Sequence, residues 1–260
     1  MKESRVITHG AMFAGIGGFD LGFERVGIRS LWQIELNDYC RALLKQRFPD
    51  AEQFYDVKNC GGESSYHVLK SVDVISGGFP CQDISTSGKG AGLNGKRSGL
   101  WSEIKRIASE LRPRFVVVEN VAALLDRGMG RVLGDLAEIG YDAEWEVLRA
   151  SDFGAPHRRE RVFIVAYSNE ERREFRIVFR EMRAQKDHWQ TDYGAACLDV
   201  WNRPERVPPA SVRMADGLSN ELDAERIGAC GNAIVPQIAE YIGRRIVEIM
   251  SEEKIIEKSA

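Results

Sequence analysis

Short apolar and β-branched runs alternate with segments of helical periodicity over the first two thirds of the chain. We expect strands over residues 8–13, 30–34, 72–75, 115–118, 144–148 and 162–166. Two segments between them, residues 100–111 and 132–139, carry apolar positions at helical spacing. Strands and helices that alternate in this way are typical of βαβ units. The pattern therefore predicts an α/β fold with a doubly wound, mostly parallel sheet.

The pattern changes after residue 168. A short amphipathic helix is expected near residues 173–183, with an apolar face and an arginine face that contain, respectively, Phe175, Val178, Phe179 and Met182, and Arg173, Arg176, Arg180 and Arg183. A proline-containing stretch follows, and a last helix is expected over residues 235–250. We therefore expect a core of residues 1–168 and 211–260 that is interrupted by a small region, residues 169–210.

Composition and charge restrict the class of protein. The chain is 43% hydrophobic with a formal net charge of -3, which argues against a protein that coats nucleic acid. A local basic patch exists at residues 86–99, with three cations and no acids. The five cysteines show no metal-ligand spacing, and no run is apolar enough to span a membrane. We expect a cytoplasmic protein without a metal or a membrane segment.

A glycine-rich turn follows the first predicted strand and opens a helix. Gly15, Gly17 and Gly18 let a cofactor approach the backbone at the amino terminus of that helix. Glu35 ends the second strand, about twenty residues beyond the glycines, where an acidic side chain accepts hydrogen bonds from ribose hydroxyls. Asp56 is expected in a similar place at the end of the third strand, facing an adenine amino group. These residues predict a nucleotide-type cofactor.

A thiol, a carboxyl group and two guanidinium groups are expected at the same edge of the sheet. Cys81 follows an apolar strand and precedes a glycine-rich basic loop, and Glu119 follows the next strand. Arg159 and Arg161 alternate along an extended stretch, so we expect both on one side of it. Carboxyl ends of strands gather catalytic groups in open α/β sheets. The four side chains are therefore expected to converge.

In this order the motifs resemble those of the DNA cytosine-5 methyltransferase family, over nearly the whole chain. The resemblance implies a Rossmann-like methyltransferase core with four catalytic residues, Cys81, Glu119, Arg159 and Arg161. It implies that S-adenosylmethionine is bound by Phe13, Gly15, Gly17, Gly18, Glu35, Leu36, Asp56, Val57, Pro80 and Asn232. Contacts to the DNA substrate are expected from Gln82, Ser85, Lys89, Arg97, Arg176 and Arg180, the last two from the arginine face described above.

The chemistry implied by the resemblance begins when the Cys81 thiolate adds to carbon 6 of a cytosine flipped out of duplex DNA. Glu119 shares a proton with ring nitrogen N3, and the arginines orient its carboxylate. Carbon 5 then takes the methyl group, which leaves S-adenosylhomocysteine. The loop over residues 82–99 is expected to close over the DNA. The base that removes the carbon 5 proton stays open.

The segment over residues 213–218 resembles the short form of the family found in phages and small bacterial modification systems. Two features depart from the family pattern: His157 replaces the usual glutamine, and the recognition region is short. We expect a monomer that acts on double-stranded DNA, with a cognate restriction endonuclease as a candidate partner. The recognised sequence stays open. The alternatives are a transfer RNA cytosine-5 methyltransferase, a nicotinamide-dependent oxidoreductase, and a DNA-binding module that has lost catalysis.

Overall fold

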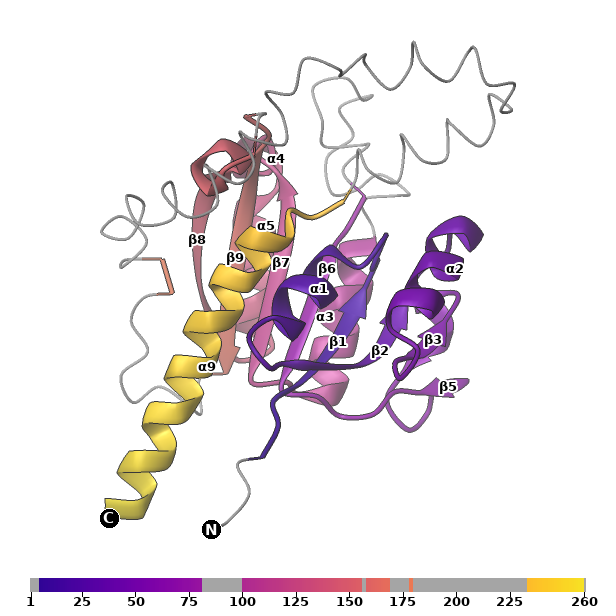
Figure 1. Ribbon diagram of the computed structural model, residues 1–260, viewed down its shortest axis with the longest axis horizontal. Coiled ribbons are helices and arrows are strands. Elements are labelled where there is room, and N and C mark those ends of the chain that lie inside the picture. The colour runs from indigo at the N-terminus through magenta and orange to yellow at the C-terminus, as the bar shows by residue number, and fades with distance from the viewer. Residues whose placement is uncertain (1–4, 81–99, 156–157, 169–177, 180–232, 260) are drawn as a thin grey trace.

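A seven-stranded sheet forms the centre of the protein (Figure 1). The computed structural model describes residues 5–80, 100–155, 158–168, 178–179 and 233–259. The sheet strands are β1 (Thr8–Met12), β2 (Arg29–Ile34), β3 (Glu52–Phe54), β6 (Val74–Gly78), β7 (Phe115–Val121), β8 (Tyr141–Arg149) and β9 (Glu160–Ser168). Their spatial order is β3-β2-β1-β6-β7-β9-β8. Two short strands, β4 (Cys60–Gly61) and β5 (His67–Val68), pair separately.

One strand of this sheet runs against the others. β3, β2, β1, β6 and β7 are parallel, whereas β9 is antiparallel to both β7 and β8. The beginning of β9 therefore lies beside the end of β7, where Val121 pairs with Arg161. The predicted mostly parallel α/β sheet is confirmed, and this inserted strand brings an arginine to the edge where the parallel strands end.

Helices cover both faces of the sheet (Figure 1). One face packs against α1 (Gly18–Glu24) and α9 (Pro236–Ser259), and the other against α3 (Trp101–Leu111), α4 (Leu124–Arg127) and α5 (Met129–Glu138). α2 (Asp38–Arg47) lies beside β3, and two 3-10 turns, η1 (Val57–Asn59) and η4 (Ala150–Phe153), follow β3 and β8. Val116 and Val118 of β7 face the α3 side, while Phe115 and Val117 face the α9 side. This alternation explains the continuous apolar run of a doubly covered strand.

The observed elements differ from the sequence-based ranges: β7 (Phe115–Val121), β9 (Glu160–Ser168) and α9 (Pro236–Ser259) are longer than expected, and α5 begins at Met129. The strand expected over residues 72–75 is instead Val74–Gly78, because Gly77 and Gly78 pair with β7 although glycine is a poor strand former. β8 begins at Tyr141 and is longer than residues 144–148. α2 was absent from the predicted helices because it buries only Cys40 and Leu44, too few for a clear apolar stripe.

The amphipathic helix expected near residues 173–183 lies outside the described residues, except for Val178 and Phe179. These two form a turn and are buried in the core that α9 covers. The backbone N–H of Val178 donates to Glu144 of β8 at 2.7 Å. Their burial agrees with the apolar face assigned to them, and the helix itself stays a prediction. The last helix is confirmed as α9.

A buried polar chain crosses the middle of the sheet at His9 of β1. Its Nδ1 lies 3.0 Å from the hydroxyl of Ser30, which donates to Asp20 of α1 at 2.8 Å. Its Nε2 lies 2.8 Å from the hydroxyl of Ser76 on β6. Burial lowers the pKa of His9 to about 4. The imidazole is therefore neutral, and this series of hydrogen bonds connects α1 with β2, β1 and β6.

Candidate active site

The turn after β1 is held in conformations that favour glycine. Phe13, Gly15 and Gly17 have φ angles of 54°, 56° and 83°. A Cβ at Gly18 would lie 2.4 Å from the carbonyl oxygen of Ile234, so α1 and the segment before α9 approach closely there. At Gly15, in contrast, a Cβ would meet no atom within 4 Å. The loop is therefore closed on the helix side and open at Gly15.

Glu35 follows β2 and is bonded to the glycine loop. One carboxylate oxygen accepts the backbone N–H of Gly15 at 2.8 Å, and the other accepts that of Asn37 at 2.8 Å. Each carboxylate oxygen can accept a further hydrogen bond, because a carboxylate offers about four acceptor positions. Leu36 is next along the chain and is 59% exposed. The two residues offer a polar and an apolar surface side by side.

Asp56 follows β3 in the corresponding position. Its carboxylate accepts the N–H of Lys58 at 3.0 Å and begins η1, and Val57 is buried behind it. Pro80, at the end of the segment after β6, is half-buried. The parallel pairing of β3, β2, β1 and β6 brings the ends of these strands, and the candidate cofactor residues that follow them, to one edge of the sheet.

Asn120 of β7 connects the ends of two neighbouring strands. Its amide Nδ2 donates to the carbonyl oxygen of Phe79 at 3.1 Å, and its Oδ1 accepts the N–H of Val121 at 2.8 Å. The side chain is 2% exposed. Phe79 lies two residues before Cys81, so Asn120 fixes the backbone from which Cys81 follows. The sequence had a signal for this role, because an amide in a buried strand needs partners.

We expect Asn120→Ala to reduce both stability and activity. The carbonyl of Phe79 loses its amide donor, and leaving a buried acceptor unsatisfied costs about 1–3 kcal/mol. Chemical denaturation measures the free energy of unfolding, and kcat is measured on the folded fraction. Asn59→Ala, at an exposed position of η1, is the matched control. Equal unfolding free energies for Asn120→Ala and the wild type would contradict the assigned role.

Glu119 and Arg161 form an ion pair at the edge of the sheet. Nε of Arg161 lies 3.0 Å from Oε1 of Glu119, and Glu119 is 8% exposed. Burial raises the pKa of Glu119 to about 7, although Arg161 and Arg159 act to lower it. At neutral pH the carboxyl is therefore divided between its protonated and ionised forms, which suits proton sharing with a bound group.

Arg159 differs from its predicted conformation. The alternation of Arg159 and Arg161 was expected to continue along one extended stretch, but Arg159 precedes β9 and has a φ angle of 30°. The chain turns there because the N–H of Ala150 is bonded to the carbonyls of Arg158 and Arg159 at 2.9 and 3.3 Å. The guanidinium of Arg159 donates to the carbonyl of Ala233 at 2.7 Å. Arg159 therefore ties the site to the segment before α9.

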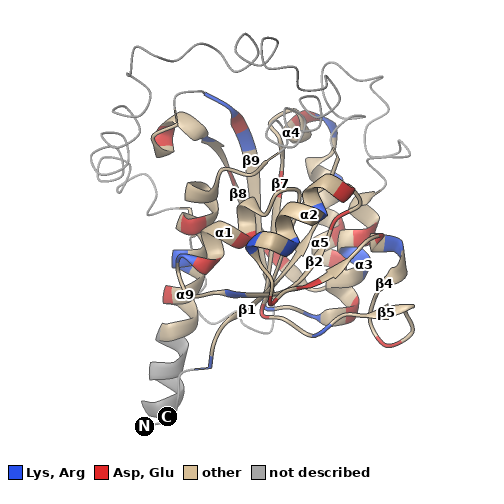
Figure 2. Ribbon diagram, turned by 45° about the vertical axis from the view of Figure 1, so that its right-hand side comes forward, with Lys and Arg blue, Asp and Glu red and all other residues tan. Residues whose placement is uncertain are grey.

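Arg159 nevertheless remains close enough to Glu119 and Arg161 to interact with both electrostatically. Burial, followed by Arg161, lowers the pKa of Arg159, while Glu119 raises it. Figure 2 shows charged positions of both signs at the beginning of β9. Glu160, the first residue of β9, pairs with Arg158 at 2.9 Å and with Arg149 at 2.7 Å. Glu119 is thus set among basic residues.

Several predicted site residues lie outside the described residues: Cys81, Gln82, Ser85, Lys89, Arg97, Arg176, Arg180 and Asn232, as does His157, the departure from the family pattern. Of the two cysteines that the structure describes, Cys40 and Cys60, both are buried. Burial raises the pKa of the Cys60 thiol to about 11, which suppresses the thiolate form. Neither therefore competes with Cys81 as the expected nucleophile.

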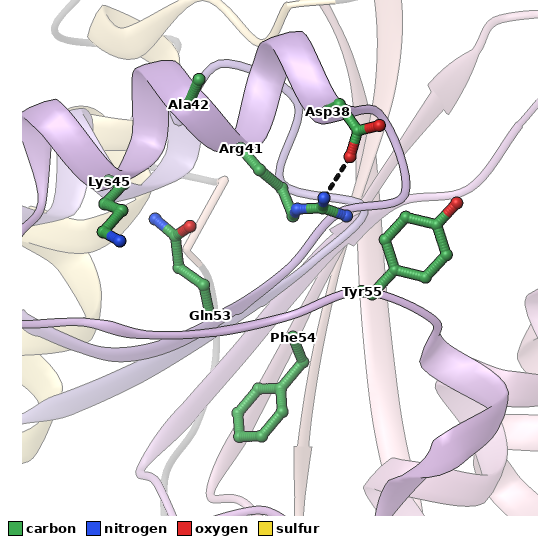
Figure 3. A pocket seen from close by; sticks show the side chains of 7 residues that line it. All are labelled: Asp38, Arg41, Ala42, Lys45, Gln53, Phe54 and Tyr55. Atoms are coloured by element: carbon green, nitrogen blue, oxygen red, sulfur yellow. Dashed lines mark hydrogen bonds and ion pairs between the residues drawn. The ribbon is translucent and has the colours of Figure 1, made fainter.

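A hollow on the surface lies between α2 and β3 (Figure 3). It is lined by Asp38, Arg41, Ala42, Lys45, Gln53, Phe54 and Tyr55. The guanidinium of Arg41 lies 4.5 Å from the centre of the Tyr55 ring. Sequence reasoning named none of these seven residues as part of a site. Over the described part of the chain, the structure holds no cluster of three potential metal ligands.

The strand order, with one antiparallel strand inserted beside the last, together with the site at the strand ends, defines an α/β methyltransferase fold. The model of the C-5 cytosine-specific DNA methylase family matches residues 7–227. The chain belongs to this family. Among the described residues, none of the helices is long and apolar enough to cross a membrane.

Individual relatives agree with this family assignment. The Type II methyltransferase M.NgoBI of Neisseria gonorrhoeae is 34% identical over 162 residues, 61% of this chain and 50% of the relative. M.HaeII of Haemophilus aegyptius is 33% identical over 171 residues, 64% of this chain and 51% of the relative. The chain thus spans about half the length of these curated relatives.

Solved structures show the same fold. A protein described as a DNA modification methyltransferase encoded within a prophage of E. coli has a TM-score of 0.56 and 25% identity, over 65% of this chain and 49% of that one. The methyltransferase EhMeth of Entamoeba histolytica has a TM-score of 0.53 and 16% identity, over 67% of this chain and 57% of that one. The second likeness concerns the fold alone.

Proposed function

We propose that the chain transfers a methyl group from S-adenosylmethionine to carbon 5 of cytosine in double-stranded DNA. The observation that carries this proposal is the buried pair of Glu119 and Arg161, with the pKa of the carboxyl near 7. Glu119 pairs with Gly78 of β6, three residues before Cys81. The expected nucleophile, Cys81, therefore comes three residues after the end of β6, the strand that pairs with β7 at Glu119.

The described residues fit the proposed cofactor. Glu35 keeps acceptor capacity for ribose hydroxyls, Leu36 exposes an apolar surface beside it, and the loop is open at Gly15. Exposed apolar surface at Leu36 gains from contact with an adenine ring. We propose that Phe13, Gly15, Gly17, Gly18, Glu35, Leu36, Asp56, Val57, Pro80 and Asn232 hold it. When bound, S-adenosylmethionine supplies an activated methyl group on a sulfonium and leaves as S-adenosylhomocysteine.

The chain's own residues activate the cytosine. The Cys81 thiolate forms a bond to carbon 6, and the electron pair of the carbon 5–carbon 6 double bond moves onto carbon 5 and, through carbon 4, toward N3. Glu119 shares its proton at N3, and Arg161 holds the carboxyl in place. Carbon 5 then accepts the methyl group. A base removes the carbon 5 proton, the double bond forms again, and the bond to Cys81 breaks with the electron pair returning to sulfur.

The proposal also covers the contacts with DNA, the cellular compartment, the oligomeric state and the partner protein. The target base must leave the duplex to reach Glu119. We propose that Gln82, Ser85, Lys89 and Arg97 bind DNA beside the base, and that residues 169–210, with Arg176 and Arg180, form the recognition region. The protein would work in the cytoplasm as a monomer, with a cognate restriction endonuclease as its candidate partner.

Methyl incorporation tests the function directly. Unmethylated DNA of high sequence complexity and unmodified transfer RNA are incubated separately with the protein and methyl-labelled S-adenosylmethionine. We expect label in the DNA, and bisulfite sequencing should place it on carbon 5 of cytosine. Label in transfer RNA but not in DNA would favour the RNA alternative. Label on another atom would contradict the proposed chemistry.

A further inference from the structure

Arg41 of α2 contacts both loops that are proposed to hold the nucleoside part of the methyl donor. Its Nη1 donates to the carbonyl oxygen of Glu35 at 3.4 Å. The same guanidinium lies over the ring of Tyr55, 4.5 Å from its centre, and pairs with Asp38 (Figure 3). The Arg41 side chain is 25% exposed, so these contacts are only partly open to solvent.

The two loops need such a connection because their strands stop pairing just before them. β2 and β3 pair through Ile34 and Phe54, and the N–H of Glu35 donates to the carbonyl of Phe54 at 3.1 Å. Beyond these residues the chain enters the Glu35–Leu36 loop on one side and the Tyr55–Asp56 loop on the other. Arg41 reaches the first through a backbone carbonyl and the second through an aromatic ring.

The two loops are proposed to contact different parts of the nucleoside. Glu35 offers acceptors to ribose hydroxyls, and Asp56 is expected near the adenine amino group. A change in the separation of the loops would therefore alter both contacts at once. Arg41 does not have to touch the nucleoside to affect its binding, since it fixes the backbone of one loop and the ring of the other.

We propose that Arg41 is a positioning residue that sets the separation of the Glu35–Leu36 and Tyr55–Asp56 loops, and thereby the affinity for the adenosine part of the methyl donor. This inference rests on the proposed function. The planar guanidinium suits the task because it donates in its plane and stacks on an aromatic ring through its face. Lysine keeps the charge but not this combined geometry.

Calorimetric binding of S-adenosylhomocysteine and of adenosine tests the proposal. We expect Arg41→Ala to raise Kd for both ligands by the same factor, about five- to twenty-fold, and to raise KM for the donor while kcat at saturation stays within two-fold. Arg41→Lys should lie between Arg41→Ala and the wild type. Lys45→Ala is the matched control, because Lys45 lines the same hollow one turn further along α2.

A double-mutant cycle separates positioning from a general loss of structure. Tyr55→Ala removes the ring, which is 53% exposed, and the loss in the double variant should be smaller than the product of the two single losses. If Arg41→Ala does not fold, Tyr55→Ala alone should still raise both Kd values. Affinities within two-fold of the wild type for Arg41→Ala, or for Tyr55→Ala in its place, would overturn the proposal, as would an equal loss in Lys45→Ala. A wild-type protein that binds neither ligand would instead contradict the proposed function.

Discussion

Cys81→Ser is expected to lower the rate of methyl transfer to duplex DNA by about 10⁴-fold or more, in line with the loss of a nucleophile in other enzymes. A serine hydroxyl is far less nucleophilic than a thiolate near neutral pH. The measurement is labelled methyl transfer under single-turnover conditions. In addition, duplex DNA that contains 5-fluorocytosine should trap the wild-type protein on a denaturing gel. Carbon 5 of this base carries fluorine in place of the proton whose removal releases Cys81. The variant should give no trapped band.

Two controls locate the defect of Cys81→Ser in the chemistry. Calorimetry should show unchanged affinity for S-adenosylhomocysteine, since Cys81 is not among the residues proposed to bind it. Cys40→Ala changes a buried cysteine of α2 and should retain both activity and trapping. Activity above about one hundredth of the wild-type rate in Cys81→Ser would place the nucleophile elsewhere and end the proposed mechanism.

Glu119→Gln is expected to lower kcat by about 10²–10³-fold, the cost of removing one preorganised group that stabilises developing charge. The amide has nearly the shape of the carboxyl and can still accept from Arg161, but it cannot give a proton to N3 of cytosine. Affinity for S-adenosylhomocysteine should be unchanged. A kcat within ten-fold of the wild type would show that Glu119 does not share a proton in the reaction.

The same variant should also change how stability depends on pH. The pKa of Glu119 is about 7 in the native protein and 4.5 in the unfolded chain, so the native state holds the extra proton between these values. This contribution to stability is complete below pH 4.5 and is lost as pH rises through 7. The loss amounts to about 3 kcal/mol. Glu119→Gln has no such titration, so its free energy of unfolding should fall less between pH 5 and pH 8 than that of the wild type. Denaturant unfolding at the two pH values measures this difference. Glu138→Gln, at an exposed position of α5, should behave as the wild type.

The central sheet could be predicted because its strands are covered on both faces. Residues 115–118 of β7 and 162–166 of β9 are continuous apolar runs, and the apolar stripes of α3 and α5 stand out from their polar neighbours. β3 has three residues, one of them buried, and was never given a range. The antiparallel direction of β9 could not be predicted either, because residue patterns along a strand do not report the direction of its neighbours.

In the candidate site, too, some residues could be predicted from the sequence and others could not. Glu35, Glu119 and Arg161 could be placed because each lies within a few residues of the end or the beginning of a strand at one edge of the sheet. The turn at Arg159 could not, since it results from hydrogen bonds between the backbone of Ala150 and a segment nine residues away. The same holds for Arg41, whose partners Glu35 and Tyr55 come together only when β2 and β3 pair.

The buried imidazole of His9 has a consequence for tolerance of acid. Its pKa of about 4 lies below its ordinary value of 6.5, so His9 takes up a proton on unfolding between these values, and stability falls as pH drops from 6.5 to 4. Glu119 releases a proton on unfolding between pH 4.5 and 7. Over the shared interval the two transfers cancel, which leaves the free energy of unfolding nearly flat with respect to these groups. The Glu119 carboxyl, whose raised pKa suits its proposed role in the reaction, thus offsets the acid sensitivity that His9 causes. Removal of this carboxyl would expose that sensitivity.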